Sequence, residues 1–301
     1  MHRIYLLDSG FTSLLNFAKL RPNGLGGISM KVNKVWCVCF SPTGTTKKIV
    51  GKIAGKIADN LNVEYVFFDF TLPAARKEQL SFAKNELVVL GSPVYAGRIP
   101  NLLLKYLQSI EGNGAFAVPV VLYGNRNYDD ALIELKDILL DGGFLPVAAA
   151  AFVGEHSFST ILAKDRPDSA DLALADDFAS KVAEKLQKES SFVPIEVKGV
   201  VKPYRGYYQP RDGEGNAIDI RKVKPLTNEL CIDCKICAKV CPLGSVDYDD
   251  VRQVTGICIK CCACIKKCPK NAKYFADTDY LYHKKDLEER FTDRSVPESF
   301  L

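Results

Sequence analysis

Eight of the eleven cysteines fall in two runs of identical spacing near the C-terminal end of the chain. Each run reads C-x2-C-x2-C-x3-C and is followed by a proline. The runs consist of Cys231, Cys234, Cys237 and Cys241, and of Cys258, Cys261, Cys264 and Cys268. This spacing is typical of [4Fe–4S] clusters, whereas zinc sites commonly have a longer interval between ligand pairs and often use histidine. No histidine lies between Asn228 and Tyr282. We therefore predict two [4Fe–4S] clusters, with a pair of zinc knuckles as the alternative.

Residues 229–275 resemble the bacterial two-cluster ferredoxins, a small α+β fold. In that family the fourth cysteine of each run binds the cluster of the other run. The resemblance implies one cluster on Cys231, Cys234, Cys237 and Cys268, and a second on Cys258, Cys261, Cys264 and Cys241. Cys262 is additional to the motif, and we predict a packed or partly exposed thiol there.

The N-terminal half alternates apolar, β-branched runs with amphipathic stretches. The predicted strands are residues 35–40, 63–68, 87–90, 118–122 and 147–153, and the predicted helices are residues 47–61, 102–110, 130–140 and 170–186. Five strands joined by crossover helices predict a doubly wound α/β domain with a parallel sheet covered on both faces. Trp36, Cys37 and Cys39 lie inside the first strand pattern, so we predict core positions for all three.

The loop after the first predicted strand reads SPTGTT and runs directly into a helix. Hydroxyls, a glycine and free backbone N–H groups at a helix N-terminus can bind an anion. The candidate residues are Ser41, Thr43, Gly44, Thr45 and Thr46. The loop has neither the triphosphate-binding pattern nor the dinucleotide fingerprint. The sequence leaves open a phosphate site and an ordinary capped turn.

Two further loops follow predicted strands, GSPVYAGRIP and YGNRNYDDAL. Together with SPTGTT they resemble the flavodoxin family over residues 32–188, and this resemblance implies bound FMN with its phosphate on the first loop. The implied ring contacts are Ser92, Tyr95, Gly97, Asn125, Arg126 and Tyr128. Tyr95 and Tyr128 are the candidates to stack on the ring, and Arg126 could stabilise negative charge on reduced flavin. His156 follows the last strand at the same end and could face the ring or be structural.

The remaining segments have distinct compositions. We interpret residues 1–30 as a leader without defined structure or an overextended gene start, with a small docking helix as the alternative. The flavodoxin-like domain then covers residues 31–190. Residues 191–228 contain several prolines and tyrosines and predict an extended linker, either packed on a domain surface or loose. Residues 276–301 form an acidic tail, weakly helical around residues 281–291, that could cover the cysteine-rich segment.

Charge and hydropathy exclude some functions. Residues 229–275 carry eight Lys and Arg against five Asp and Glu. Clusters bound to thiolates are themselves negative and offset this excess, so the basic charge is no sign of nucleic-acid binding. No apolar run is long enough to span a bilayer. Because cluster thiolates need a reducing environment, we predict a cytoplasmic protein.

The order of the two segments resembles bacterial and archaeal flavodoxin–ferredoxin fusion proteins. This resemblance implies electron transfer between two [4Fe–4S] clusters, FMN and redox partner proteins, with no catalytic acid, base or nucleophile. The alternatives are an FMN-dependent reductase of a small molecule fed by the clusters, and a redox sensor. Oligomeric state, donor and acceptor stay open. We also expect the cysteine-rich segment to pack against the flavin-binding end of the sheet.

Overall fold

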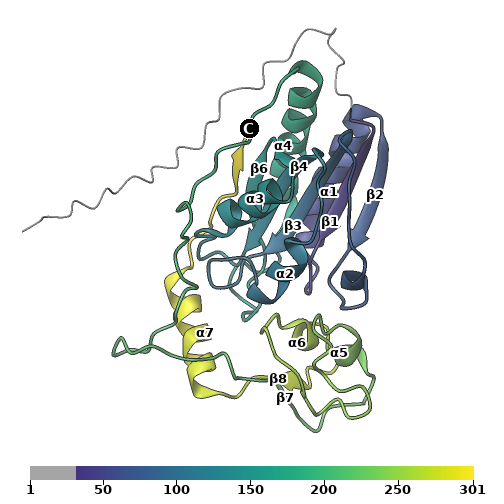
Figure 1. Ribbon diagram of the computed structural model, residues 1–301. Coiled ribbons are helices and arrows are strands. Elements are labelled where there is room, and N and C mark those ends of the chain that lie inside the picture. The colour runs from purple at the N-terminus through teal and green to yellow at the C-terminus, as the bar shows by residue number, and fades with distance from the viewer. Residues whose placement is uncertain (1–31) are drawn as a thin grey trace, which may run out of the picture.

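A computed structural model describes residues 32–301, so the predicted leader lies outside the described residues. The chain forms a large α/β domain and a small cysteine-rich module at one end of it (Figure 1). Five parallel strands build the sheet in the order β2-β1-β3-β4-β6. They are β1 (Lys34–Cys39), β2 (Glu64–Asp69), β3 (Glu86–Pro93), β4 (Phe116–Tyr123) and β6 (Ala149–Val153). This is the flavodoxin-like doubly wound order, whose ligand crevice lies where the order reverses, beside β1 and β3.

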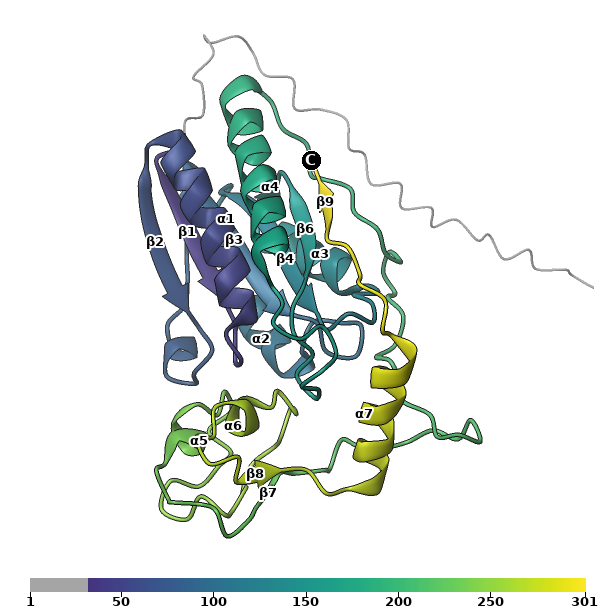
Figure 2. The ribbon, with the colours of Figure 1, turned by 180° about the vertical axis from the view of Figure 1, so that it is seen from behind.

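Helices cover both faces of the sheet, and the two faces show clearly in Figure 2. One face carries α1 (Thr45–Leu61) and α4 (Ser169–Lys188); the other carries η2 (Asn101–Leu103), α2 (Leu104–Leu107) and α3 (Ala131–Asp141). A short turn of helix, η1 (Ala75–Lys77), follows β2. In α1 the isoleucines at every fourth position are fully buried, because that spacing keeps them on one side of the helix. Cys37 and Cys39 are fully buried in the same core, as predicted, whereas Trp36 is only partly buried and packs edge-on against Phe82 on the opposite face.

The sheet has more strands than the sequence predicted. The strand predicted at residues 147–153 is β6, which begins two residues later, and a separate short strand, β5 (Leu145–Pro146), precedes it. A further strand from the chain's end, β9 (Glu298–Phe300), pairs antiparallel with β6. The prediction of five parallel strands is therefore incomplete. β9 is only three residues long, too short to show an alternating pattern, and it forms because the free edge of β6 offers unpaired backbone groups.

The linker packs along the α/β domain and is not a loose tether. Asp130 at the start of α3 is fully buried, and its carboxylate accepts hydrogen bonds from the backbone N–H groups of Val200 and Arg205 at 3.0 and 2.9 Å. The Arg205 guanidinium pairs with the same carboxylate. Tyr207 donates to the Ile99 carbonyl at 2.8 Å. The bonds to Arg205 lower the pKa of Asp130 to about 2.

We expect Asp130→Asn to lower the free energy of unfolding at pH 7 by about 1.5–3 kcal/mol, the usual value for hydrogen bonds to a charged group. Asp130 has a depressed folded-state pKa, so its contribution is present above the unfolded value of about 3.9 and is lost as pH falls toward 2. Urea unfolding measures the difference. The matched control is Asp141→Asn, whose pair with Lys202 is exposed and contributes at most about 1 kcal/mol. Equal losses in both variants would contradict this role.

The cysteine-rich module is built from short elements. They are β7 (Leu226–Thr227), α5 (Ile236–Lys239), α6 (Ala263–Lys266) and β8 (Lys273–Tyr274), and β7 pairs antiparallel with β8. The helix α7 (Thr278–Arg290) follows and begins three residues before the predicted range, because the Asp277 carboxylate caps it by accepting from the Tyr280 N–H at 2.9 Å. Within residues 32–301, no helix is long and apolar enough to cross a membrane.

Candidate functional site

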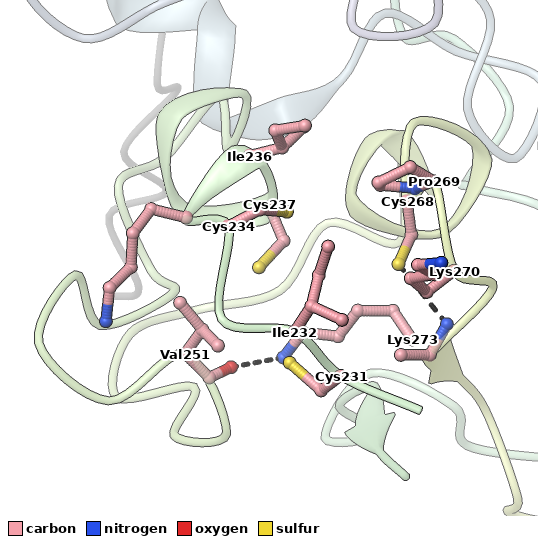
Figure 3. Close-up of a pocket in the computed structure, with 12 residues that line it drawn as sticks. Cys231, Ile232, Cys234, Ile236, Cys237, Val251, Cys268, Pro269, Lys270 and Lys273 are labelled. Atoms are coloured by element: carbon pink, nitrogen blue, oxygen red, sulfur yellow. Dashed lines mark hydrogen bonds between the residues drawn. The ribbon is translucent and has the colours of Figure 1, made fainter. Parts of the chain in front are cut away.

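The first cavity of the cysteine-rich module has four cysteines on its wall. Three come from the first run and one is the last cysteine of the second run: Cys231, Cys234, Cys237 and Cys268. Figure 3 shows these side chains facing the cavity, together with Lys273 and Val251. This is the group of four that the resemblance implied for one cluster.

The second cavity contains the reciprocal group. Its wall includes Cys241 from the first run and Cys258, Cys261 and Cys264 from the second. The two runs therefore exchange their fourth cysteines between the cavities. Within residues 32–301, no group of three or more His, Cys, Asp or Glu is arranged to hold a single metal ion.

The two runs repeat one backbone conformation. The residues two and four positions after the first cysteine have positive φ in both runs, at Asp233 and Lys235 and again at Lys260 and Cys262. The fourth cysteine of each run accepts a backbone N–H at 3.2 Å, Cys241 from Ser245 and Cys268 from Ala272. The repeated turns place equivalent cysteines in equivalent positions.

The repeat also explains the extra cysteine. Cys262 caps α6 as Lys235 caps α5, with φ of 59° and 62°. It is buried and lines the second cavity beside the four motif cysteines, and its sulfur contacts the Lys260 carbonyl at 3.4 Å and the Tyr280 hydroxyl at 3.6 Å. The prediction of a packed thiol is confirmed.

Burial changes the chemistry of the cysteine thiols. It raises the pKa of Cys261 and Cys264 far above the ordinary value. Both thiols are therefore neutral when no metal is present, and binding of metal must displace their protons.

A third cavity lies at the carboxyl ends of the parallel strands. Four loops of the α/β domain line it, with Thr43, Thr45 and Thr46 after β1, Tyr95 after β3, Gly124 after β4, and Glu155 and His156 after β6.

The first loop presents hydroxyl and N–H groups to this cavity. Gly44 has a φ of +100°, a conformation that favours glycine, and it caps α1. The first N–H groups of a helix have no partner inside the helix. Those of Thr45 and Thr46 have no acceptor elsewhere in residues 32–301. Ser41 lies behind the loop, where its hydroxyl accepts the Lys47 N–H at 2.9 Å and its own N–H donates to Thr71. Three of the five predicted phosphate residues thus line the cavity, and Ser41 and Gly44 shape the loop.

The second loop brings one predicted ring residue to the cavity. Tyr95 lines it, and backbone hydrogen bonds between Tyr95 and Arg98 close the turn. Gly97 lies in this turn with a φ of +78°, and a Cβ atom there would come within 2.2 Å of the Asp129 carboxylate. Ser92 is fully buried and its hydroxyl donates to the Pro93 carbonyl. Neither Gly97 nor Ser92 lines the cavity, and their contacts with the ring stay a prediction.

The polar side chains of the third loop bind to other parts of the chain. The side chain of Asn125 donates to the carbonyls of Phe291 and Asp293 in the tail, at 2.7 and 2.8 Å. Arg126 pairs with Asp129, and the buried Tyr128 donates to Glu298 at 3.1 Å. Other groups bind these three side chains and they are not among the residues that line the cavity, so their contacts with the ring stay a prediction.

His156 is the titratable ring on the cavity wall. Its Nδ1 accepts the backbone N–H of Phe158 at 3.1 Å, so Nε2 carries the proton of the neutral ring. Burial and the nearby charge of Lys266 and Arg126 lower the pKa of His156 to about 3. A Cβ atom on Gly124 would lie 2.3 Å from the imidazole, so glycine at that position gives the ring its space.

Cys261 connects the two kinds of cavity. It lines the second cysteine cavity and also the third cavity. Burial and the neighbouring Cys261 raise the pKa of Tyr95 well above its ordinary value.

Two polar contacts fix the cysteine-rich module in place. Arg76 donates to the Pro242 carbonyl, and Lys266 pairs with Glu155. The expectation that the cysteine-rich segment packs at this end of the sheet is confirmed (Figures 1 and 2).

Comparisons with known proteins give structural neighbours only. No protein-family model and no curated protein matches this chain. A flavodoxin from the domain Archaea is 18% identical, with 51% of this chain and 99% of that chain covered and a TM-score of 0.37. Flavodoxin 1 from Bacillus cereus is 17% identical, with 50% of this chain and 98% of that chain covered and a TM-score of 0.38. An NADH:FMN oxidoreductase is 16% identical, with 54% of this chain and 95% of that chain covered and a TM-score of 0.40.

The lowered pKa of His156 predicts acid sensitivity. Its folded-state value of about 3 lies below the unfolded value of about 6.5, so its contribution to stability is full above pH 6.5 and is lost as pH falls toward 3. We expect His156→Gln to lose less unfolding free energy than the wild type between about pH 6.5 and 5, by up to about 1.4 kcal/mol per pH unit. Urea unfolding at several pH values measures this, and parallel pH dependences would disprove it.

Proposed function

We propose that this chain is an electron-transfer protein that holds two [4Fe–4S] clusters and FMN and exchanges electrons with redox partner proteins. The observation that carries the proposal is the double position of Cys261, on the walls of both the second cysteine cavity and the third cavity. Clusters exchange single electrons and flavin accepts one or two, so together they would connect one-electron partners with two-electron chemistry.

The residues fit these groups. Each cysteine cavity includes the four motif thiols that a [4Fe–4S] cluster takes, and Cys262 is a fifth thiol on the wall of the second. The hydroxyls and free N–H groups at the start of α1 suit the FMN phosphate, and Tyr95 offers an aromatic face to the ring. In this proposal residues 31–190 are the flavin domain, residues 191–228 the connector, residues 229–275 the cluster module and residues 276–301 its anchor. Eight thiolates require a reducing compartment, for which we propose the cytoplasm.

The geometry favours a carrier over a reductase of small molecules. A reductase needs an open substrate site beside the ring, and of the two polar candidates His156 and Arg126 only His156 lines the third cavity. Arg126 instead pairs with Asp129 and lies over the Tyr208 ring, 4.5 Å from its centroid. Cys261 lines the same cavity, so the cysteine-rich module covers part of the proposed flavin site.

The cluster assignment has a direct test in two adjacent cysteines. Anaerobically purified protein should contain about eight iron atoms per chain, the sum of two four-iron sites, with equivalent sulfide. Cys261→Ser should lose about half of this iron, and the matched control Cys262→Ser should keep all of it, because only the first thiol belongs to the predicted set. Stoichiometric zinc without sulfide would refute the proposal.

The flavin assignment has a test in the first loop. Thr43→Val should weaken FMN binding by about 1.5–3 kcal/mol, the usual value for a hydrogen bond to a charged group. The same variant should bind riboflavin as the wild type does, because riboflavin lacks the phosphate. Fluorescence titration measures both. Equal weakening for the two flavins would assign Thr43 a role in loop structure instead.

A further inference from the structure

A buried lysine side chain crosses the first cysteine cavity. Lys273 begins β8, is 3% exposed and lines this cavity. Its ammonium donates to the carbonyl oxygen of Val251, which is also buried. In Figure 3 the Lys273 side chain extends across the cavity in the direction of Cys231.

This ammonium lacks a protein counter-charge. An ammonium has three N–H donors, and Lys273 uses one of them on Val251. Among residues 32–301 it forms no ion pair with a carboxylate. Burial of an unpaired charge is costly, so an anion is expected beside it.

The two cysteine cavities differ in charge. Three lysines line the first, Lys235, Lys270 and Lys273. Among the described residues, no charged side chain lines the second. The other buried lysine of the module, Lys260, lies outside the second cavity's wall and donates to the carbonyls of Arg221 and Cys258 at 2.6 and 2.7 Å. The backbone N–H bonds to sulfur, one for each group of four cysteines, do not distinguish the cavities.

We propose that Lys273 is the counter-charge of the cluster in the first cavity and makes that cluster the more easily reduced of the two. This inference rests on the proposed function. Reduction adds one electron to a cluster without making or breaking a bond, and a buried positive charge beside the cluster stabilises the added negative charge. The exposed Cys234 admits solvent to the same cluster, and solvent acts in the same direction. The first electron added to the chain therefore reduces the cluster in the first cavity, which has no cysteine on the wall of the third cavity.

Redox titration of the intact, cluster-loaded chain, followed by electron paramagnetic resonance, tests the inference. The wild type should show two separate midpoint potentials. Lys273→Met should move the higher one to more negative values, by about 59 mV for each tenfold loss of electron affinity, and leave the lower one in place. Lys273→Arg should keep both potentials. Lys270→Met, on the exposed rim of the same cavity, should cause a smaller shift that high salt removes.

Iron content separates the possible outcomes. A chain without about eight irons refutes the proposed function itself. Two clusters with one common potential, or a Lys273→Met variant with unchanged potentials, refute only the role of Lys273. If Lys273→Met loses about four irons while Lys273→Arg keeps all, the counter-charge role is supported. Equal loss of iron in both variants would show that the shape of Lys273 matters and not its charge, and would refute the counter-charge role.

Discussion

The fourth cysteine of each run lies in the cavity of the other run, and the cysteine-rich module depends on this exchange. Neither run can complete a group of four alone, since Cys241 and Cys268 belong to each other's cavities. The module has little else to hold it together, because its helices are one turn long and its sheet has two residues in each strand. A fold of this size buries too little apolar surface for independent stability and commonly relies on metal.

The position of the module follows from contacts on three sides. Arg76 holds the Pro242 carbonyl, Lys266 pairs with Glu155, and Ile259 packs against the core of the sheet. On the third side, Tyr280 of α7 packs against Phe158 with ring centroids 4.8 Å apart. These contacts bring Cys261 to the wall of the third cavity, so the arrangement behind the proposed electron transfer depends on packing as well as on the cysteine motif.

Local sequence patterns predicted much of the fold and part of the site. Three long helices, α1, α3 and α4, and the five parallel strands are periodic enough to be read directly, whereas the helix predicted at residues 102–110 is only η2 and the four-residue α2. The resemblance carried by the cysteine spacing implied the grouping seen in the two cavities. The third loop shows the limit of such patterns. Asn125 and Tyr128 look like ligand residues after a strand, but tail residues more than 160 positions later bind them. Lys273 carries no local signal either, because its significance depends on the burial that the whole module creates.

The tail has a mechanical consequence. The linker enters the cysteine-rich module from the α/β domain, and α7 and β9 return the chain to the same domain, where Ser295 bonds to Asn125 and β9 pairs with β6. The module is thus an insertion anchored at both ends. A domain on a single flexible tether samples a volume set by the tether's length, and its encounters depend on an effective concentration. A doubly anchored module is confined to one position. The proposed electron transfer between its second cavity and the third cavity would therefore have a rate that is independent of protein concentration and insensitive to crowding.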